Sequence, residues 1–245
     1  MFSRRTAWDR AENELTRRLG ALRARGAPLL DLTESNPTHA GLAYPAERIL
    51  SALADPGALR YEPDPRGLRT AREAVAAHLR RDGAAVSPDE LLLTASTSEA
   101  YAWLFKLLCE PGDSVLAFSP SYPLLEYLTA LESVELVHAH LLEAAGWALD
   151  LDEVRRLATP RTRAVIAVNP ANPTGQFLAR GELDALLALC AERGWAFICD
   201  EVFNGYGVGE DAERVRSVAG RESPALTFAL SGLSKAAGLP QLKLV

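Results

Sequence analysis

The sequence has no long apolar run and no tract of basic residues. None of its apolar stretches approaches the roughly 20 residues that a helix needs to cross a membrane. Residues 1–25 are charged throughout and lack the apolar centre of a signal peptide. The net charge of −6 argues against a nucleic-acid surface. We therefore expect a soluble, cytoplasmic protein that binds neither nucleic acid nor a membrane.

Cysteine is also scarce. The three cysteines, Cys109, Cys190 and Cys199, lie in apolar segments and lack the spacing of metal ligands. This pattern is typical of buried thiols in a reducing compartment, and it predicts neither a metal site nor a cysteine nucleophile. The sequence shows no internal repeat or low-complexity linker. With 245 residues, 48% of them hydrophobic, the chain can form one sizeable core, or one large domain and part of another.

What the sequence does contain, from residue 66 onward, is an alternation of amphipathic and apolar segments. We expect helices over 67–81, 98–109, 122–131, 152–158 and 180–193, and strands over 91–95, 114–118, 134–140, 164–168, 195–199 and 226–230. Apolar strands separated by amphipathic helices predict an α/β three-layer sandwich with a mainly parallel sheet. Leu15, Leu19 and Leu22 have helical spacing and predict an N-terminal helical arm, and residues 31–44 are predicted to form a loop.

Three of the predicted strands are followed by polar groups of different kinds. Lys235 follows strand 226–230, Asp200 follows strand 195–199, and Asn172 follows strand 164–168. Ligands of parallel sheets gather at the carboxyl ends of the strands. An amine, a carboxylate and an amide at one edge suit pyridoxal 5'-phosphate. The amine can hold the aldehyde as a Schiff base, the carboxylate can keep the pyridine nitrogen protonated, and the amide can bond the phenolic oxygen.

Three motifs then carry a resemblance to a known family. They are Asn-Pro-x-Asn-Pro-Thr-Gly at 169–175, Asp-Glu-Val-aromatic at 200–203 and Ser-x-x-Ser-Lys-x-x-Gly-Leu-Pro at 231–240. From about residue 30 to its end, the chain resembles the class I/II pyridoxal phosphate-dependent aminotransferases of fold type I. The resemblance implies a transaminase that moves an amino group between an amino acid and a 2-oxo acid through a Lys235 Schiff base. It assigns Asp200 to the pyridine nitrogen.

The resemblance also implies where the cofactor phosphate binds. Ser96 and Thr97 open the helix after strand 91–95, and in the family this turn holds the phosphate. A plain helix cap is the alternative interpretation of these two residues. Ser231 and Ser234 precede the lysine, although relatives usually place a serine where this chain has Gly232.

Two further positions complete this prediction. Lys243 stands where the family usually has an arginine that clamps the phosphate, so the charge remains and the bidentate fork is lost. Tyr61 resembles the tyrosine that reaches the phosphate of the neighbouring subunit's cofactor, which implies a homodimer with shared sites. A loop aromatic beside prolines is the alternative for Tyr61.

Five residues are assigned by resemblance to the cofactor ring and the substrate. Tyr122 opens the predicted helix after strand 114–118, and aromatic residues there stack on the pyridine ring in many relatives. Phe203 replaces the tyrosine that in most aminotransferases bonds the phenolic oxygen, which leaves Asn172 for that role. Ser35 and Asn36 fall in the loop where relatives meet the substrate carboxylate.

We expect residues 1–45 to form the N-terminal helix and substrate loop, and residues 46–245 the pyridoxal phosphate-binding large domain, incomplete at its C-terminus. Relatives continue into a C-terminal small domain that supplies the arginine for the substrate α-carboxylate. We therefore expect this domain to be absent and the chain alone to be inactive. Two alternatives stay open. One is a carbon–sulfur β-lyase on the same scaffold, in which a histidine often replaces Phe203, and the other is a non-catalytic aminotransferase-like sensor domain.

Overall fold

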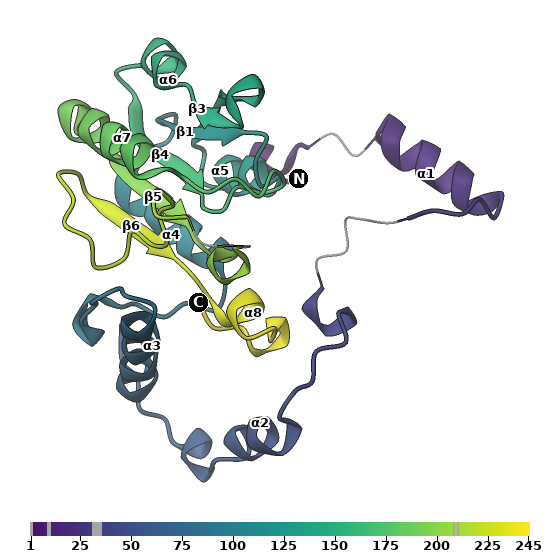
Figure 1. The fold of residues 1–245 in the computed structure, drawn as a ribbon, viewed down its shortest axis with the longest axis vertical. Coiled ribbons are helices and arrows are strands. Elements are labelled where there is room, and N and C mark those ends of the chain that lie inside the picture. The colour runs from purple at the N-terminus through teal and green to yellow at the C-terminus, as the bar shows by residue number, and fades with distance from the viewer. Residues whose placement is uncertain (1, 9–10, 31–35, 208, 210) are drawn as a thin grey trace.

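The main body of the protein is a six-stranded sheet. A computed structural model describes residues 2–8, 11–30, 36–207, 209 and 211–245. The strands are β1 (Ser114–Ser119), β2 (Glu135–Leu142), β3 (Ala148–Leu149), β4 (Thr162–Val168), β5 (Ala196–Asp200) and β6 (Thr227–Leu230). They lie in the order β3-β2-β1-β4-β5-β6, and every neighbouring pair is parallel except β2 with β3 (Figure 1). The predicted mainly parallel sheet is confirmed.

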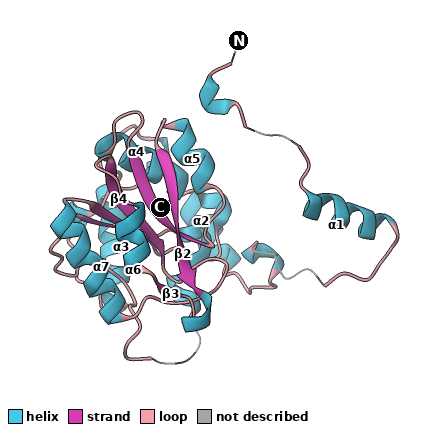
Figure 2. Ribbon diagram, turned by 90° about the horizontal axis from the view of Figure 1, so that it is seen from above, coloured by secondary structure: helices cyan, strands magenta, loops and turns pink. Residues whose placement is uncertain are grey.

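Helices cover both faces of this sheet. One face packs against α4 (Thr97–Leu108) and α5 (Leu125–Leu131), the other against α6 (Leu151–Leu157) and α7 (Arg180–Arg193). Because successive side chains of a strand point to opposite faces, Ala164 and Ile166 of β4 join the core with α4, and Val165 and Ala167 join the core with α7. The predicted three-layer sandwich is confirmed, and Figure 2 shows the strands between the helices.

The N-terminal third of the chain forms an arm around this body. It contains α1 (Glu14–Ala24), α2 (Ala46–Leu53) and α3 (Arg69–Arg81), and in Figure 1 α1 stands apart from the sheet. The predicted N-terminal helix is confirmed, and it buries none of its residues. The segment that precedes α1 in the sequence contacts the main body. There Trp8 meets the ring of Tyr127 edge to face, with 5.1 Å between the ring centroids.

The predicted strand 91–95 is wrong. The segment is extended, but its paired hydrogen bonds are those of Thr94 with Val245, at 2.8 and 2.9 Å. A strand requires a longer ladder of such bonds. The last residues reach this position because the chain turns after β6 through α8 (Leu233–Ala236) and runs back, with the N–H of Leu233 donating to the carbonyl of Leu244. The loop that carries Lys235 therefore ends beside the start of α4.

The predicted helix 122–131 also needs a correction at its start. It begins at Leu125, so Tyr122 lies in the turn ahead of it. A residue that precedes proline disfavours the helical conformation, and Tyr122 precedes Pro123. The remaining predicted helices and strands from residue 66 onward are present, with boundaries that differ by no more than two residues.

Candidate functional site

Asp200 ends β5 and is almost completely buried, with 3% of its surface exposed. One carboxylate oxygen accepts a hydrogen bond from the hydroxyl of Tyr101 at 3.1 Å. The other accepts from the backbone N–H of Val202 at 3.2 Å. Burial raises the pKa of Asp200 to about 6, and these two hydrogen bonds limit the rise because they favour the charged form. A buried carboxylate with this pKa suits a ligand that brings a positive charge or a proton.

The amine of Lys235 lies beside an aromatic pair that follows the same strand. Its Nζ is 5.3 Å from the centroid of the Phe203 ring, within the range of a cation–π contact. The rings of Phe203 and Tyr206 meet at an angle of 75°, and the hydroxyl of Tyr206 donates to the backbone carbonyl of Lys235 at 3.1 Å. The segment after Asp200 therefore holds the helix that presents the lysine.

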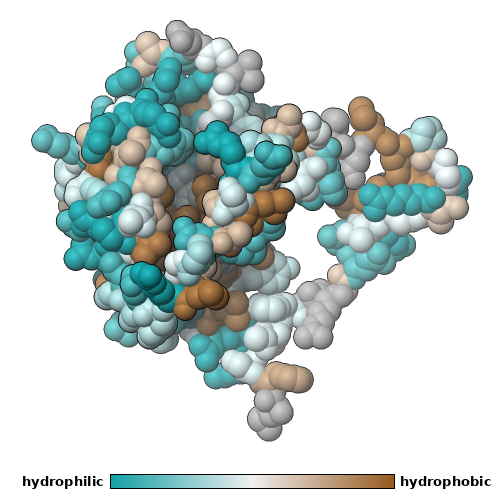
Figure 3. Space-filling model, turned by 90° about the horizontal axis from the view of Figure 1, so that it is seen from below, coloured by the Kyte–Doolittle hydropathy of each residue, from teal (hydrophilic) through white to brown (hydrophobic). Residues whose placement is uncertain are grey.

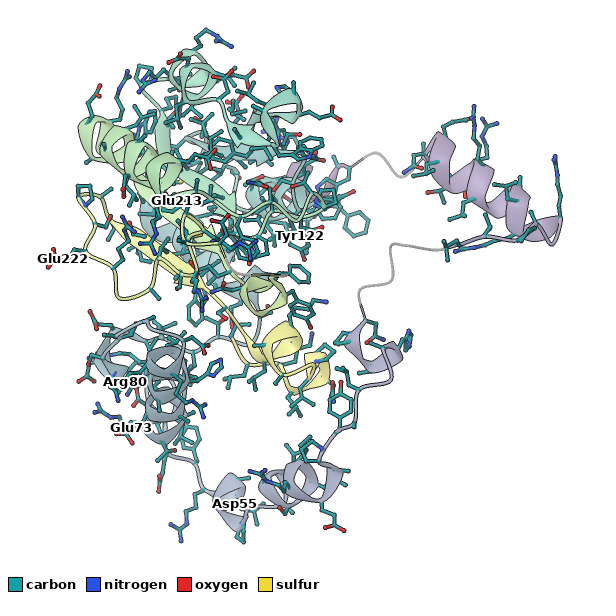
Figure 4. All side chains as sticks on the ribbon, viewed as in Figure 1. Asp55, Glu73, Arg80, Tyr122, Glu213 and Glu222 are labelled. Carbon is teal, nitrogen blue, oxygen red and sulfur yellow. The ribbon has the colours of Figure 1, made fainter. Side chains whose placement is uncertain are left out.

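Tyr122 belongs to the same end of the sheet. Its side chain is half-buried, and burial raises its pKa, with a further rise from the negative charge of Asp200. The structure thus places this ring within electrostatic range of the carboxylate. Figure 4 shows Tyr122 on the main body, well apart from Asp55 in the arm. The sequence predicts that the residues of the cofactor site lie at one edge of the sheet. The structure brings Tyr122 near Asp200 and Phe203 near Lys235.

The start of α4 offers backbone donors for an anion. Ser96 is the N-cap, and its hydroxyl accepts from the N–H of Glu99 at 3.1 Å, while the carboxylate of Glu99 accepts from the N–H of Ala95 at 2.7 Å. The N–H groups of Thr97 and Ser98 lie in the first turn, where a helix has no acceptor of its own for them. Such donors and the helix dipole favour a phosphate. The hydroxyl of Ser96 serves as a cap.

The loop after β6 explains the glycine at position 232. A Cβ there would lie 2.7 Å from the Cγ2 of Val245 and 3.0 Å from the carbonyl oxygen of Leu244, so a serine does not fit this backbone. Ser234, next to Lys235, is half-buried, whereas Ser231 and Lys243 are exposed. Lys243 has a positive φ of 42° at the turn that returns the chain toward Thr94.

The next three predicted site residues are Asn172, Tyr61 and Ser35. Asn172 is half-buried and lines a small cavity with Phe118 and Phe177, toward α7. Tyr61 is 89% exposed on the arm. Ser35 lies outside the described residues.

The neighbouring residue Asn36 caps a short 3-10 helix, Pro37–His39, by accepting from the N–H of Thr38 at 3.0 Å. The segment that follows meets the lysine loop, because the hydroxyl of Tyr44 donates to the carbonyl of Gly238. The predicted substrate loop thus leads into a segment that contacts the turn after Lys235.

Three buried polar residues at this edge were missed in the sequence. Tyr101 resembles a core aromatic because Leu104 and Phe105, three and four residues later, share its helix face. Asn169 is completely buried, donates to the carbonyl of Val215 at 2.9 Å and accepts from the N–H of Leu178 at 2.9 Å. The one signal for Tyr101 and Asn169 is general: a phenol or an amide that is buried requires a hydrogen-bond partner.

Glu201, the third of these residues, is also almost completely buried. Its carboxylate accepts from the hydroxyl of Ser217 at 2.6 Å and from the N–H of Val218 at 2.7 Å, and burial raises its pKa to about 7. Together with Asn169 it fastens residues 215–218, here called the strap, to the ends of β4 and β5. The strap thus fixes the edge that carries Asp200.

Two further features are absent from the described residues. None of the helices there is long and apolar enough to cross a membrane. Nor do these residues contain a group of three or more His, Cys, Asp or Glu side chains that could hold a metal ion.

Comparison with known proteins gives a consistent picture. The family described as aminotransferase class I and II matches residues 27–244. The chain is 32% identical over 216 residues to the aspartate/prephenate aminotransferase of Thermus thermophilus, covering 88% of this chain and 54% of that protein. It is 29% identical over 215 residues to a glutamate–pyruvate aminotransferase of Escherichia coli, covering 87% and 53%. The chain therefore spans about half the length of these curated relatives.

Solved structures agree. An alanine aminotransferase from Pyrococcus furiosus superposes with a TM-score of 0.84 at 25% identity, covering 100% of this chain and 62% of that chain. A mutant aspartate aminotransferase from Thermus thermophilus gives 0.82 at 30% identity, covering 100% and 63%. The sheet and helices described above are thus the fold of these aminotransferases over the part that this chain spans.

Proposed function

The chain belongs to the class I and II aminotransferase family, and on that premise we propose that the whole protein is a transaminase that moves an amino group between an amino acid and a 2-oxo acid. The family depends on pyridoxal 5'-phosphate. The observation that carries the proposal is that β5 ends in a buried carboxylate, Asp200, and that the amine of Lys235 lies against the ring of Phe203, three residues after it.

The residues at this edge fit the cofactor. Pyridoxal phosphate, when bound, supplies a ring that accepts electrons from the α-carbon of the amino acid. Asp200 would hold a proton on the pyridine nitrogen, and its burial leaves it in need of a positively charged partner. Lys235 would hold the cofactor through Nζ and, once freed by the incoming amino acid, move the proton at the substrate α-carbon. Tyr122 would stack on the ring, and Asn172 would donate to the phenolic oxygen.

The phosphate would lie at the start of α4. The N–H groups of Thr97 and Ser98 would bind it together with Ser234, because the loop after β6 ends beside this helix. Ser96 would orient the turn, and the exposed Ser231 and Lys243 would reach the phosphate from the loop.

We also propose the finer assignments that concern the assembly. The protein would be a cytoplasmic homodimer, with Tyr61 reaching the phosphate in the second subunit; its 89% exposure leaves the side chain available for this. Ser35 and Asn36 would meet the substrate carboxylate. Residues 1–45 would form the N-terminal helix and substrate loop, and residues 46–245 the cofactor-binding domain.

The test is an amino-transfer assay on the whole protein with bound pyridoxal phosphate. Donor amino acids, among them aspartate, glutamate and alanine, are supplied with a 2-oxo acid acceptor, and both products are identified. Formation of a new amino acid from the acceptor supports the proposal. Pyruvate and ammonia from a cysteine-type substrate, with no new amino acid, would support a β-lyase instead. If neither reaction occurs, both functions are contradicted.

A further inference from the structure

The hydroxyl of Tyr101 is embedded among apolar side chains. Tyr101 lies on the inner face of α4 with 0% of its surface exposed, in a core cluster that includes Ala100, Leu104 and Phe105. Its ring stacks on that of Phe105 with 5.8 Å between centroids. A phenol placed at such a position is costly unless its hydroxyl has a partner, and that partner is Asp200, at 3.1 Å from the hydroxyl.

The direction of this hydrogen bond is set by the chemistry of both groups. Burial raises the pKa of Tyr101 well above its usual 10, with a further rise from the charge of Asp200, so the phenol keeps its proton and donates. An ionised carboxylate only accepts. Since Val202 donates to the second oxygen, both oxygens of Asp200 are held, one by the strand end and one by α4.

We propose that Tyr101 is a positioning residue for Asp200, which it holds ionised and oriented to receive the protonated pyridine nitrogen. This role rests on the proposed function of the site. In this role Tyr101 acts on the cofactor through the carboxylate of Asp200.

The groups around Asp200 show why one hydroxyl matters. Tyr122 faces it from the turn before α5, and Cys199 and Glu201 flank it in the chain. Ionised Glu201 and Asp200 disfavour each other's charge. The hydrogen bonds from Tyr101 and Val202 favour the charged form of Asp200 and so lower its pKa. When the Tyr101 hydroxyl is lost, only the N–H of Val202 remains of these two donors to Asp200.

The first experiment uses the 245-residue chain without cofactor. Aspartate side-chain carboxyls are labelled with carbon-13, the signal of Asp200 is identified by its loss in Asp200→Asn, and its titration is followed by NMR. Tyr101→Phe keeps the ring and its packing and removes only the hydroxyl. We expect the midpoint of Asp200 to move up from about 6 by about one pH unit, the size expected for one hydrogen bond to a charged group.

Tyr127→Phe on α5 is the matched control, because its ring packs against Trp8 and the donors to the two oxygens of Asp200 are Tyr101 and Val202. It also removes one phenolic hydroxyl and should leave the titration of Asp200 unchanged. Near-ultraviolet circular dichroism establishes that each variant remains folded. An Asp200 midpoint in folded Tyr101→Phe equal to that of the unsubstituted chain would overturn the proposal.

The second experiment measures the affinity for pyridoxal 5'-phosphate by its absorption, at pH 6.5 and pH 8.5. Because less Asp200 is ionised at the lower pH, Tyr101→Phe should bind roughly threefold more weakly than the unsubstituted chain at pH 6.5, and nearly equally at pH 8.5. An equal loss at both values would indicate a packing effect and contradict the proposal. Failure of the whole unsubstituted protein to bind would count against the proposed function, while the titration would still decide whether Tyr101 controls Asp200.

Discussion

Phe203 places a ring without a hydroxyl beside the amine of Lys235. A donor to the phenolic oxygen of the cofactor stabilises the negative charge that appears there when the bound cofactor loses its proton. We expect Phe203→Tyr to lower the pH at which the long-wavelength absorption band fades by about one unit. The measurement is a spectroscopic pH titration of the holoprotein. Phe177→Tyr, on the α7 side, is the control, and an unchanged titration in Phe203→Tyr would show that Phe203 does not lie over that oxygen.

Asp200 carries the second prediction for a single side chain. Asp200→Ala removes the group that would keep the pyridine nitrogen protonated, so amino transfer should fall by at least about 100-fold while the cofactor stays attached through Lys235. Initial rates and the absorption of bound cofactor are measured together. Turnover close to that of the unsubstituted protein would rule out this role for Asp200.

Lys235 and Asp200 could be predicted from the sequence because each follows a run of apolar residues, where a charge is informative. Tyr101 could not, since a tyrosine among leucine and phenylalanine at helical spacing has the pattern of ordinary core. Its hydrogen bond joins residues 99 positions apart. That partner depends on how α4 packs across β5, which no local pattern contains.

The strap of residues 215–218 determines how the edge of the sheet responds to pH. Burial raises the pKa of Glu201 from 4.5 to about 7. In the unfolded chain the lower value returns, so between pH 4.5 and pH 7 the folded protein binds more protons than the unfolded chain. Its free energy of unfolding therefore falls as pH rises through this range and levels off above it. The difference in pKa corresponds to about 3 kcal/mol.

Glu201→Gln tests this effect. The amide keeps an oxygen for the N–H of Val218 and has no charge to bury, so the free energy of unfolding should fall less between pH 4.5 and pH 7 and exceed that of the unsubstituted chain at pH 8. Urea unfolding at several pH values provides the measurement. Glu222→Gln, on the exposed loop before β6, is the control (Figure 4). A parallel pH dependence in Glu201→Gln and the unsubstituted chain would contradict the assignment.

The elements themselves show where sequence prediction succeeds. Strands β1, β4 and β5 and helix α7 were predicted from apolar runs and amphipathic spacing, since burial on a sheet or under a helix imposes those patterns. Residues 91–95 have a similar apolar composition and form no strand, because their backbone bonds go singly to Arg66 and as one reciprocal pair to Val245, which is too short for a ladder. Strand formation depends on a neighbour as well as on composition.

The arm gives the whole molecule an exposed apolar surface. Leu50 and Leu53 of α2 are 63% and 56% exposed, and Figure 3 shows apolar patches on the face seen from below. Exposed apolar side chains grouped in this way are typical of interfaces. We expect the protein to sediment as a dimer and Leu50→Asp to shift it toward the monomer. Ser51→Asp introduces the same charge next to it and should have a smaller effect, and equal sedimentation of all three proteins would contradict an interface on α2.

In the proposed function, Lys235 holds pyridoxal phosphate at the carboxyl edge of the sheet. The 245 residues contain three lysines, which a labelling experiment distinguishes. Lys106 pairs with Glu132 on the body, Lys243 is exposed in the turn toward Thr94, and Lys235 lies against Phe203. The holoprotein is reduced with borohydride, digested, and the pyridoxyl-bearing peptide is sequenced by mass spectrometry. We predict the label on Lys235 alone, and a label on Lys106 or Lys243 in its place would contradict the assignment of Lys235.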